Sequence, residues 1–293
     1  MKPSNSRFVE IRGLQCHVRE WGTPGRPQLH LLHGWGDASA TFQFLVDALR
    51  HDWHVLAPDW RGFGLSRSGA DAFWFPDYLG DLDALLTHFS PSEPVRLVGH
   101  SMGGNIACTY AGVRPARVAA VVALDAFGLP DRQPQDAPGR LEKWLNQLAQ
   151  PDGFRAYVDT DAFAARLMRD NPRLAPDKAR FLATRLTRSD DQGGVRVSID
   201  DAHRHVNPVL YRRAEAEHCW RRAKARVCWI VQADPVWRRK LGVPDEVYAA
   251  ATACFAHFRE VAIAESGHNL HHDQPERVAA VIEDFMLECL PDV

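Results

Sequence analysis

The chain of 293 residues has almost no surplus of charge of either sign, because it contains 35 lysines and arginines against 37 aspartates and glutamates. Proteins that bind nucleic acid or anionic membrane surfaces usually carry a basic excess, so the composition favours neither partner. No apolar run is long enough to span a bilayer, and residues 1–6 lack the apolar segment of a secretory signal. We therefore expect a cytoplasmic protein that does not contact membranes.

Cysteine is also sparse, and its spacing shows no pattern. The six cysteines form no Cys-x-x-Cys pair, and most of them fall in apolar runs: Cys16, Cys108, Cys219, Cys228, Cys254 and Cys289. This distribution indicates buried free thiols in a reducing compartment rather than a disulfide framework. Internal repeats and low-complexity segments are absent, so a repeat architecture is excluded.

The most informative stretch of the chain is residues 95–104. Residues 95–98 form an apolar run that predicts a buried strand, and residues 105–111 can continue as a helix. Between them lies a Gly-x-Ser-x-Gly pattern centred on Ser101. A serine in a sharp turn crowds the positions two before and two after it, which explains glycine at Gly99 and Gly103. Strand, sharp turn and helix together are typical of a nucleophile elbow, which makes Ser101 the candidate nucleophile.

Short apolar runs alternate with helical patterns along most of the chain. We expect strands at residues 8–11, 15–18, 28–32, 55–57, 95–98, 118–124, 227–231 and 260–264. This alternation predicts an α/β fold with a doubly wound, mostly parallel sheet. The alternation of strands and helices is interrupted over residues 127–219. This segment is rich in Arg, Asp and Pro and shows helical patterns near 141–148, 162–168 and 177–186. We therefore expect a core of residues 1–126 and 220–293, with residues 127–219 as a helical lid inserted after the sixth strand.

A serine nucleophile needs a histidine base, and that histidine needs a carboxylate to orient it. His268 follows the strand at 260–264, and Asp234 follows the strand at 227–231, in the chain order Ser, Asp, His. We favour Asp234 as the acid, with Asp125 after the strand at 118–124 as the alternative. His271 and His272 lie close enough to His268 in sequence to compete for its role, although we expect them at a solvated helix start.

An oxyanion hole requires converging backbone N–H groups. We expect these groups from Met102, directly after the nucleophile, and from Trp35, in the turn that follows the third strand. His33 and His100 are expected to brace loops, and Asp59 and Arg61 to tie loops together beneath the site. Tryptophans could line an acyl pocket, although core packing explains the last two equally well: Trp35, Trp60, Trp74, Trp144 and Trp237.

These motifs together resemble the α/β-hydrolase fold serine hydrolases over essentially the whole chain. The resemblance rests on residues 33–36 (His-Gly-Trp-Gly), 59–66 (Asp-Trp-Arg-Gly-Phe-Gly-Leu-Ser) and 99–104, then on Asp234 and Gly267-His268, all in the family's order. The His-Gly-Trp-Gly version is similar to small carboxylesterases and to serine hydrolase-like proteins. One departure is that the turn before Asp234 lacks the family's usual glycine, and some members take their acid from the strand that precedes Asp125.

The resemblance implies hydrolysis of a small or medium acyl ester through an acyl-enzyme, without a metal or organic cofactor. His203 and His205 have no further ligand at metal-binding spacing, so we expect no metal site there. Two alternatives remain open. One is a non-catalytic ligand-binding protein on the same fold, and the other is a carbon–carbon bond hydrolase, a cofactor-free haloperoxidase or a lyase.

Overall fold

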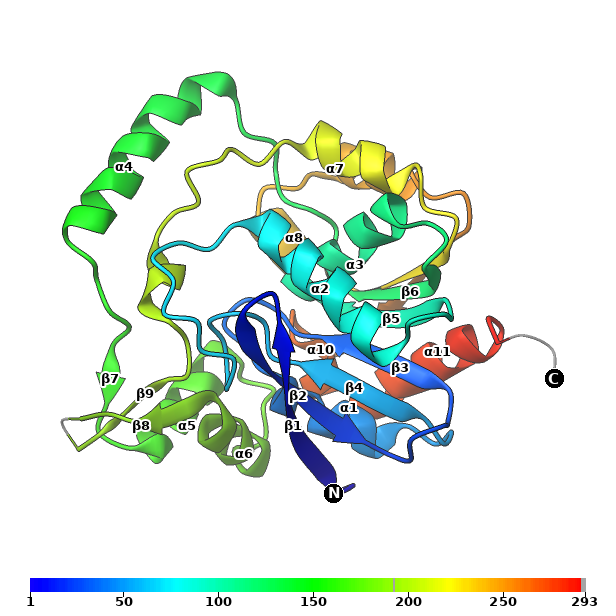
Figure 1. Ribbon diagram of the computed structural model, residues 1–293, viewed down its shortest axis with the longest axis horizontal. Coiled ribbons are helices and arrows are strands. Elements are labelled where there is room, and N and C mark those ends of the chain that lie inside the picture. Colours follow the sequence, from blue (N-terminus) through cyan, green and yellow to red (C-terminus); the bar gives the residue numbers. More distant parts are fainter. Residues whose placement is uncertain (192, 291–293) are drawn as a thin grey trace.

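An eight-stranded sheet forms the centre of the molecule in the computed structural model, which describes residues 1–191 and 193–290 (Figure 1). The strand order is β1-β2-β4-β3-β5-β6-β10-β11. Their bounds are Ser4–Ile11 (β1), Leu14–Trp21 (β2), Gln28–Leu32 (β3), His54–Pro58 (β4), Val95–His100 (β5), Val118–Leu124 (β6), Arg226–Gln232 (β10) and Phe258–Ile263 (β11). Strand β2 pairs antiparallel with β1 and β4, and the remaining pairs are parallel. The predicted doubly wound, mostly parallel sheet is therefore confirmed.

Helices cover both faces of this sheet because its strands are apolar on both sides. In β5, Leu97 packs into one hydrophobic core and its neighbour Val98 into the other, as the alternation of side chains along a strand requires. The first core is closed by α2 (Phe75–Phe89), α3 (Met102–Val113), α7 (Arg213–Trp220) and α9 (Asp245–Thr252). The second is closed by α1 (Gln43–Ala48), α10 (Leu270–Asp273) and α11 (Pro275–Leu287).

The chain between β6 and β10 leaves the alternating pattern, as the sequence predicts. It contains α4 (Ala137–Ala149), α5 (Thr160–Asp170) and α6 (Pro176–Leu186) at the three expected helical stretches. It also contains a small sheet in the order β7-β9-β8, which was not predicted: Ala156–Tyr157 (β7), Thr187–Ser189 (β8) and Val195–Val197 (β9). Such short strands leave no periodic signal in the sequence.

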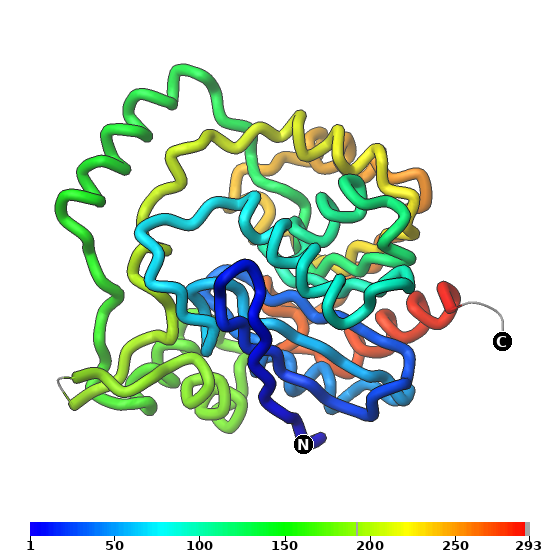
Figure 2. The backbone as a smooth tube through the Cα atoms, viewed as in Figure 1, coloured from blue at the N-terminus to red at the C-terminus, as the bar shows by residue number. Residues whose placement is uncertain are grey.

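Helix α7 begins within the predicted lid but packs on the core. A Cβ atom added to Gly112 of α3 would lie only 1.7 Å from the backbone oxygen of Cys219 in α7, so the two helix backbones are in close contact. We therefore use "the insertion" for residues 127–212. Within it, α4 arches away from the body of the molecule (Figure 2), and Leu145 on this helix is 58% exposed.

The rest of the insertion is tied to one loop and one helix of the core. The backbone N–H of Gly64 donates to the carbonyl of Ser198 at 2.8 Å, and the N–H of Asp200 donates to the carbonyl of Gly62 at 2.8 Å. On the other side, Lys178 of α6 donates its Nζ to the carbonyl of His272 in α10 at 2.8 Å. The insertion therefore covers both the 59–69 loop and α10. In the described part of the chain, no helix has the length and apolar character needed to cross a membrane.

Candidate active site

Ser101 occupies the turn between β5 and α3 with a backbone that side chains rarely adopt. Its φ is 50° and its ψ is −114°. The turn is so tight that a Cβ on Gly99 would lie 2.4 Å from the carbonyl carbon of Gly103, and a Cβ on Gly103 would lie 2.1 Å from the oxygen of Leu32. Both positions therefore require glycine, and the turn presents the Ser101 side chain at the carboxyl ends of the parallel strands.

His268 lies directly beside this hydroxyl, on the loop between β11 and α10. Its Nε2 is 3.0 Å from Ser101 Oγ, and its Nδ1 is 2.7 Å from Oδ2 of Asp125. Because a carboxylate can only accept, Nδ1 carries the proton and the lone pair of Nε2 faces the serine. Trp237, from α8 (Val236–Lys240), stacks on the imidazole with ring centroids 4.4 Å apart and fixes its plane.

The carboxylate that contacts His268 is Asp125, not Asp234, which corrects the preference drawn from the sequence. Asp234 lies two residues beyond the end of β10, in the exposed turn that leads into α8. That turn directs Trp237, rather than a carboxylate, at the imidazole. Asp125 follows β6 immediately, adopts a positive φ of 48°, and donates its backbone N–H to the carbonyl of Ile230 at 2.8 Å. This bend brings its side chain to His268.

Asp125 is held by a residue that the sequence analysis missed. Gln232, the last residue of β10, donates its Nε2 to Oδ2 of Asp125 at 3.0 Å. The Asp125 side chain is 1% exposed, and a buried carboxylate needs donors of this kind. The only available signal in the sequence was a polar residue closing an otherwise apolar strand, two positions before Asp234.

The loop that carries Trp35 is held against the nucleophile. A Cβ on Gly34 would lie 3.2 Å from Cβ of Ser101, so this loop and the elbow touch. The buried His33 ring holds the loop in place. Its Nδ1 donates to the carbonyl of Gly34 at 2.7 Å, and its Nε2 accepts a hydrogen bond from the backbone N–H of Trp60 at 2.9 Å. Burial lowers the pKa of His33 to about 4, which keeps the ring neutral for both bonds. Met102 begins α3, so its N–H has no acceptor within the helix.

Asp59 ties three segments together beneath the site. Its carboxylate accepts hydrogen bonds from the backbone N–H groups of Ser39 and Leu65, at 2.6 and 2.9 Å, and from Nδ1 of His17 at 2.8 Å. Burial opposes ionisation of Asp59, but the bonds from His17 and Leu65 outweigh it and lower the pKa of Asp59 to about 2. Arg61 pairs with Asp81 of α2 at 2.5 Å and so anchors the same loop.

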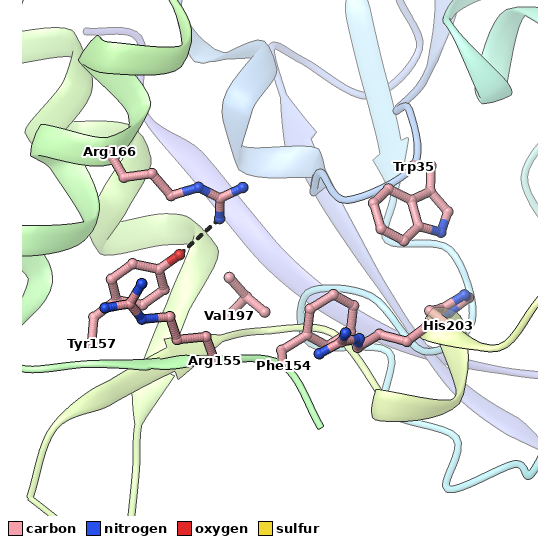
Figure 3. Close-up of a pocket in the computed structure, with 8 residues that line it drawn as sticks. Trp35, Phe154, Arg155, Tyr157, Arg166, Val197 and His203 are labelled. Carbon is pink, nitrogen blue, oxygen red and sulfur yellow. Dashed lines mark hydrogen bonds between the residues drawn. The ribbon is translucent and has the colours of Figure 1, made fainter. Parts of the chain in front are cut away.

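A pocket of about 400 Å³ opens between the Trp35 loop and the insertion (Figure 3). It is lined by Trp35, Phe154, Arg155, Tyr157, Arg166, Val197, His203 and Arg204. Three of these eight residues are arginines and none is acidic. Trp35 and Phe154 face each other with ring centroids 6.3 Å apart, and Arg166 donates Nη1 to the Tyr157 hydroxyl at 2.9 Å. The pocket is therefore both aromatic and basic.

Two of the other histidines differ from their expected settings, and a third packs against the 59–69 loop. His271 and His272 are 0% and 5% exposed, so the predicted solvated helix start is wrong; α6 of the insertion covers this helix through Lys178. His203 stacks on Phe73, and its Nε2 donates to the carbonyl of Arg61 at 3.1 Å. That bond occupies one of the two ring nitrogens of His203.

Residues 27–275 match a family described as having the alpha/beta hydrolase fold. A serine hydrolase-like protein of Danio rerio is 32% identical over 295 residues, which cover 97% of this chain and 87% of that protein. A 2-(acetamidomethylene)succinate hydrolase of Mesorhizobium japonicum is 29% identical over 227 residues, which cover 72% of this chain and 78% of the relative. Among solved structures, a thioesterase domain from the curacin biosynthetic pathway superposes with a TM-score of 0.85 at 23% identity, over 96% of this chain and 99% of that domain. The chain therefore belongs to the alpha/beta hydrolase fold family.

Proposed function

We propose that the chain is a serine hydrolase that cleaves carboxylic esters through an acyl-enzyme. The observation that carries the proposal is the continuous chain of hydrogen bonds from Ser101 Oγ through the His268 ring to Asp125. The same order of groups activates the nucleophile in known serine hydrolases. Membership of the family supports a hydrolase, and the ester as substrate is our inference.

Each residue has a defined step in this reaction. His268 Nε2 takes the proton of Ser101 as Oγ attacks the ester carbonyl, and Asp125 stabilises the imidazolium that forms. The N–H groups of Trp35 and Met102 would hold the negative oxygen of the tetrahedral intermediate. The imidazolium then gives its proton to the leaving alkoxide, and the acyl group stays on Ser101. Water, deprotonated by His268, attacks the acyl carbonyl; His268 then returns this proton to Ser101 Oγ as the acyl–oxygen bond breaks and the acid is released.

A fluorophosphonate probe tests the nucleophile directly. The wild-type protein should form a covalent adduct at Ser101 and hydrolyse p-nitrophenyl esters of graded chain length, and Ser101→Ala should do neither. A folded wild-type protein that the probe does not label would favour the alternative of a ligand-binding protein. Labelling without hydrolysis of any ester would instead favour a different acyl bond or a lyase reaction.

The basic pocket supports an acyl group that ends in an anion. Trp35 lines the pocket and its neighbour Gly34 lies against Ser101, so the pocket is next to the elbow. Three arginines with no acidic residue among the lining side chains favour a carboxylate there. One relative is named for the hydrolysis of a succinate derivative, which is a dicarboxylate. We therefore expect kcat/KM for p-nitrophenyl hemisuccinate to exceed that for the neutral p-nitrophenyl butyrate.

Helix α5 offers a matched pair of variants for this expectation. Arg166 lines the pocket, whereas Arg169 on the same helix has a side chain that is 76% exposed and does not line it. Arg166→Gln should raise KM for the hemisuccinate by about tenfold, the loss of one charge-assisted bond, and leave the butyrate unaffected. Arg169→Gln should change neither substrate. Equal effects of both variants on both esters would show that the pocket does not bind the acyl group.

A further inference from the structure

A second cluster of polar side chains lies behind the candidate active site. It consists of Asp37, in the turn after the Trp35 loop, His100, the last residue of β5, and His271 in α10. These residues are 9%, 3% and 0% exposed, respectively. One potential ligand atom from each lies within 4.8 Å of those of the other two. Three segments that are distant in the sequence thus converge on one buried point.

The nitrogens of this cluster lack the partners that buried nitrogens normally have. Within residues 1–191 and 193–290, Nδ1 of His100 and both ring nitrogens of His271 have no hydrogen-bond partner, and all are shielded from solvent. Buried polar atoms in folded proteins are nearly always bonded, so two imidazoles that converge with free ring nitrogens call for a ligand, which would bind one nitrogen of each ring. The remaining polar atom of His100 is accounted for, since Nε2 lies 3.0 Å from the carbonyl oxygen of His268.

That last contact determines which nitrogen of His100 can bind a ligand. A carbonyl oxygen only accepts, so Nε2 of His100 must carry the proton. The lone pair is therefore on Nδ1, which is the nitrogen that remains for a ligand. Metal-binding histidines typically donate their other ring N–H to a carbonyl or carboxylate in this way, which fixes both tautomer and ring orientation.

The loop in front of His100 approaches this nitrogen so closely that it needs glycine there. A Cβ on Gly34 would lie 2.9 Å from Nδ1 of His100, closer than a side chain can approach. On the opposite side, Asp37 is fixed by its own turn, because the backbone N–H of Ala38 donates to Oδ1 at 2.9 Å. The Thr41 hydroxyl also lies beside this carboxylate, but it donates its proton to the carbonyl of Ala38 at 2.9 Å, so an oxygen of Asp37 remains for a ligand.

We propose that Asp37, His100 and His271 form a binding site for a divalent transition-metal ion of the zinc class. Two imidazoles and one carboxylate are the donor set that Zn²⁺ accepts, whereas Mg²⁺ and Ca²⁺ prefer oxygen donors. Tetrahedral zinc with bonds of about 2.1 Å places its ligand atoms about 3.4 Å apart. Small side-chain rotations bring the three atoms from within 4.8 Å to that spacing, and water supplies the fourth ligand.

Occupancy of this site has a consequence for hydrolysis, which rests on the proposed function. The rings of His100 and His268 are 4.8 Å apart, centroid to centroid. A bound dication would therefore oppose the positive charge that His268 acquires during attack by Ser101. The metal-loaded protein should turn over esters at least tenfold more slowly than the metal-free protein.

Binding itself is measured without any substrate, so its outcome is independent of the proposed hydrolysis. Metal-free protein is titrated with ZnCl₂ by calorimetry, and Co²⁺ is added in a parallel sample to record its visible absorption bands. We expect one Zn²⁺ per chain and cobalt bands typical of four-coordinate nitrogen and oxygen ligation. No stoichiometric binding would overturn the proposal and leave a buried, water-bridged cluster.

Three variants distinguish Zn²⁺ binding at this site from Zn²⁺ binding at surface histidines. Asp37→Asn keeps the size of the side chain and the bond from Ala38, and His271→Gln removes the imidazole; each should weaken Zn²⁺ binding at least 100-fold. His272→Gln is the matched control, because this neighbour is also buried but lies outside the cluster, and it should bind like the wild type. If His271→Gln does not fold, Asp37→Asn decides. Equal affinity in the wild type and Asp37→Asn would overturn the proposal.

Discussion

Gln232 donates its side-chain amide to the same carboxylate oxygen of Asp125 that accepts the hydrogen bond from His268. The bond from Gln232 depends on the parallel pairing of β6 and β10, and the bond from His268 also depends on the pairing of β10 with β11. The neighbouring strand β10 therefore positions the Asp125 carboxylate independently of its contact with His268.

The first prediction separates the two carboxylates. Asp125→Asn should lower kcat for ester hydrolysis by about 10⁴-fold, because an amide at this position no longer selects the tautomer of His268 that accepts the serine proton. Asp234→Asn is the control, and since its side chain is exposed it should stay within about twofold of the wild type. Steady-state kinetics of both purified variants give the answer. A larger loss in Asp234→Asn would contradict the geometry described above.

The second prediction concerns Gln232 as a positioning residue. Gln232→Ala removes one hydrogen bond to a buried carboxylate, an interaction worth about 1.5 kcal/mol, so kcat should fall by about tenfold. KM should stay unchanged, because Gln232 does not line the basic pocket. Gln232→Glu would place a second carboxylate against Asp125, and its loss of kcat should become smaller as the pH falls and one of the two groups binds a proton. A rise in KM alone would assign Gln232 to substrate binding.

The third prediction concerns the strain at the nucleophile. A residue other than glycine with φ of 50° and ψ of −114° costs about 1–3 kcal/mol, so the turn is maintained at the expense of stability. Ser101→Gly should therefore raise the free energy of unfolding by about 1 kcal/mol, after the entropy cost of glycine is subtracted. Ser101→Ala, which keeps Cβ, should not. Urea unfolding of the two inactive variants compares them directly, and equal stabilities would mean that the turn is unstrained.

The elbow could be predicted from sequence because its signals are local. Gly99, Ser101 and Gly103 are constrained by contacts within a few residues, and the flanking strand and helix have clear apolar patterns. The choice between Asp125 and Asp234 depends instead on where two loops point after their strands pair. Both aspartates follow the carboxyl ends of adjacent strands. Only Asp125 has a positive φ, which directs its side chain to His268.

The burial of the histidines of α10 also could not be predicted from local sequence patterns. The run from residue 270 to 273 is polar enough to suggest a solvated helix start, yet His271 and His272 are buried. Their burial comes from α6, about ninety residues earlier in the chain, which reaches α10 through Lys178. A pattern in one segment cannot reveal such a cover, so the cluster around His271 had no counterpart among the sequence predictions.

The fourth prediction follows from histidines that burial keeps neutral. Burial lowers the pKa of His30 to about 3 and those of His33 and His203 to about 4, against an ordinary value of 6.5. Between pH 6.5 and about 4, each of these histidines is protonated in the unfolded chain but neutral in the folded protein. Each therefore lowers the free energy of unfolding by about 1.4 kcal/mol per pH unit as the pH falls through this range. Asp37 acts in the opposite direction, because burial raises its pKa to about 7.

The histidines outnumber this one opposing carboxyl, so the free energy of unfolding should fall steadily below pH 6.5. Urea unfolding at a series of pH values from about 7 down to about 4.5 measures the slope. His203→Gln retains an N–H donor for the carbonyl of Arg61 but cannot titrate, so its slope should be shallower by about one proton even if its stability at neutral pH is lower. An unchanged slope in this variant would mean that His203 takes up its proton without unfolding, despite the stacked rings of Phe63 and Phe73 that enclose it.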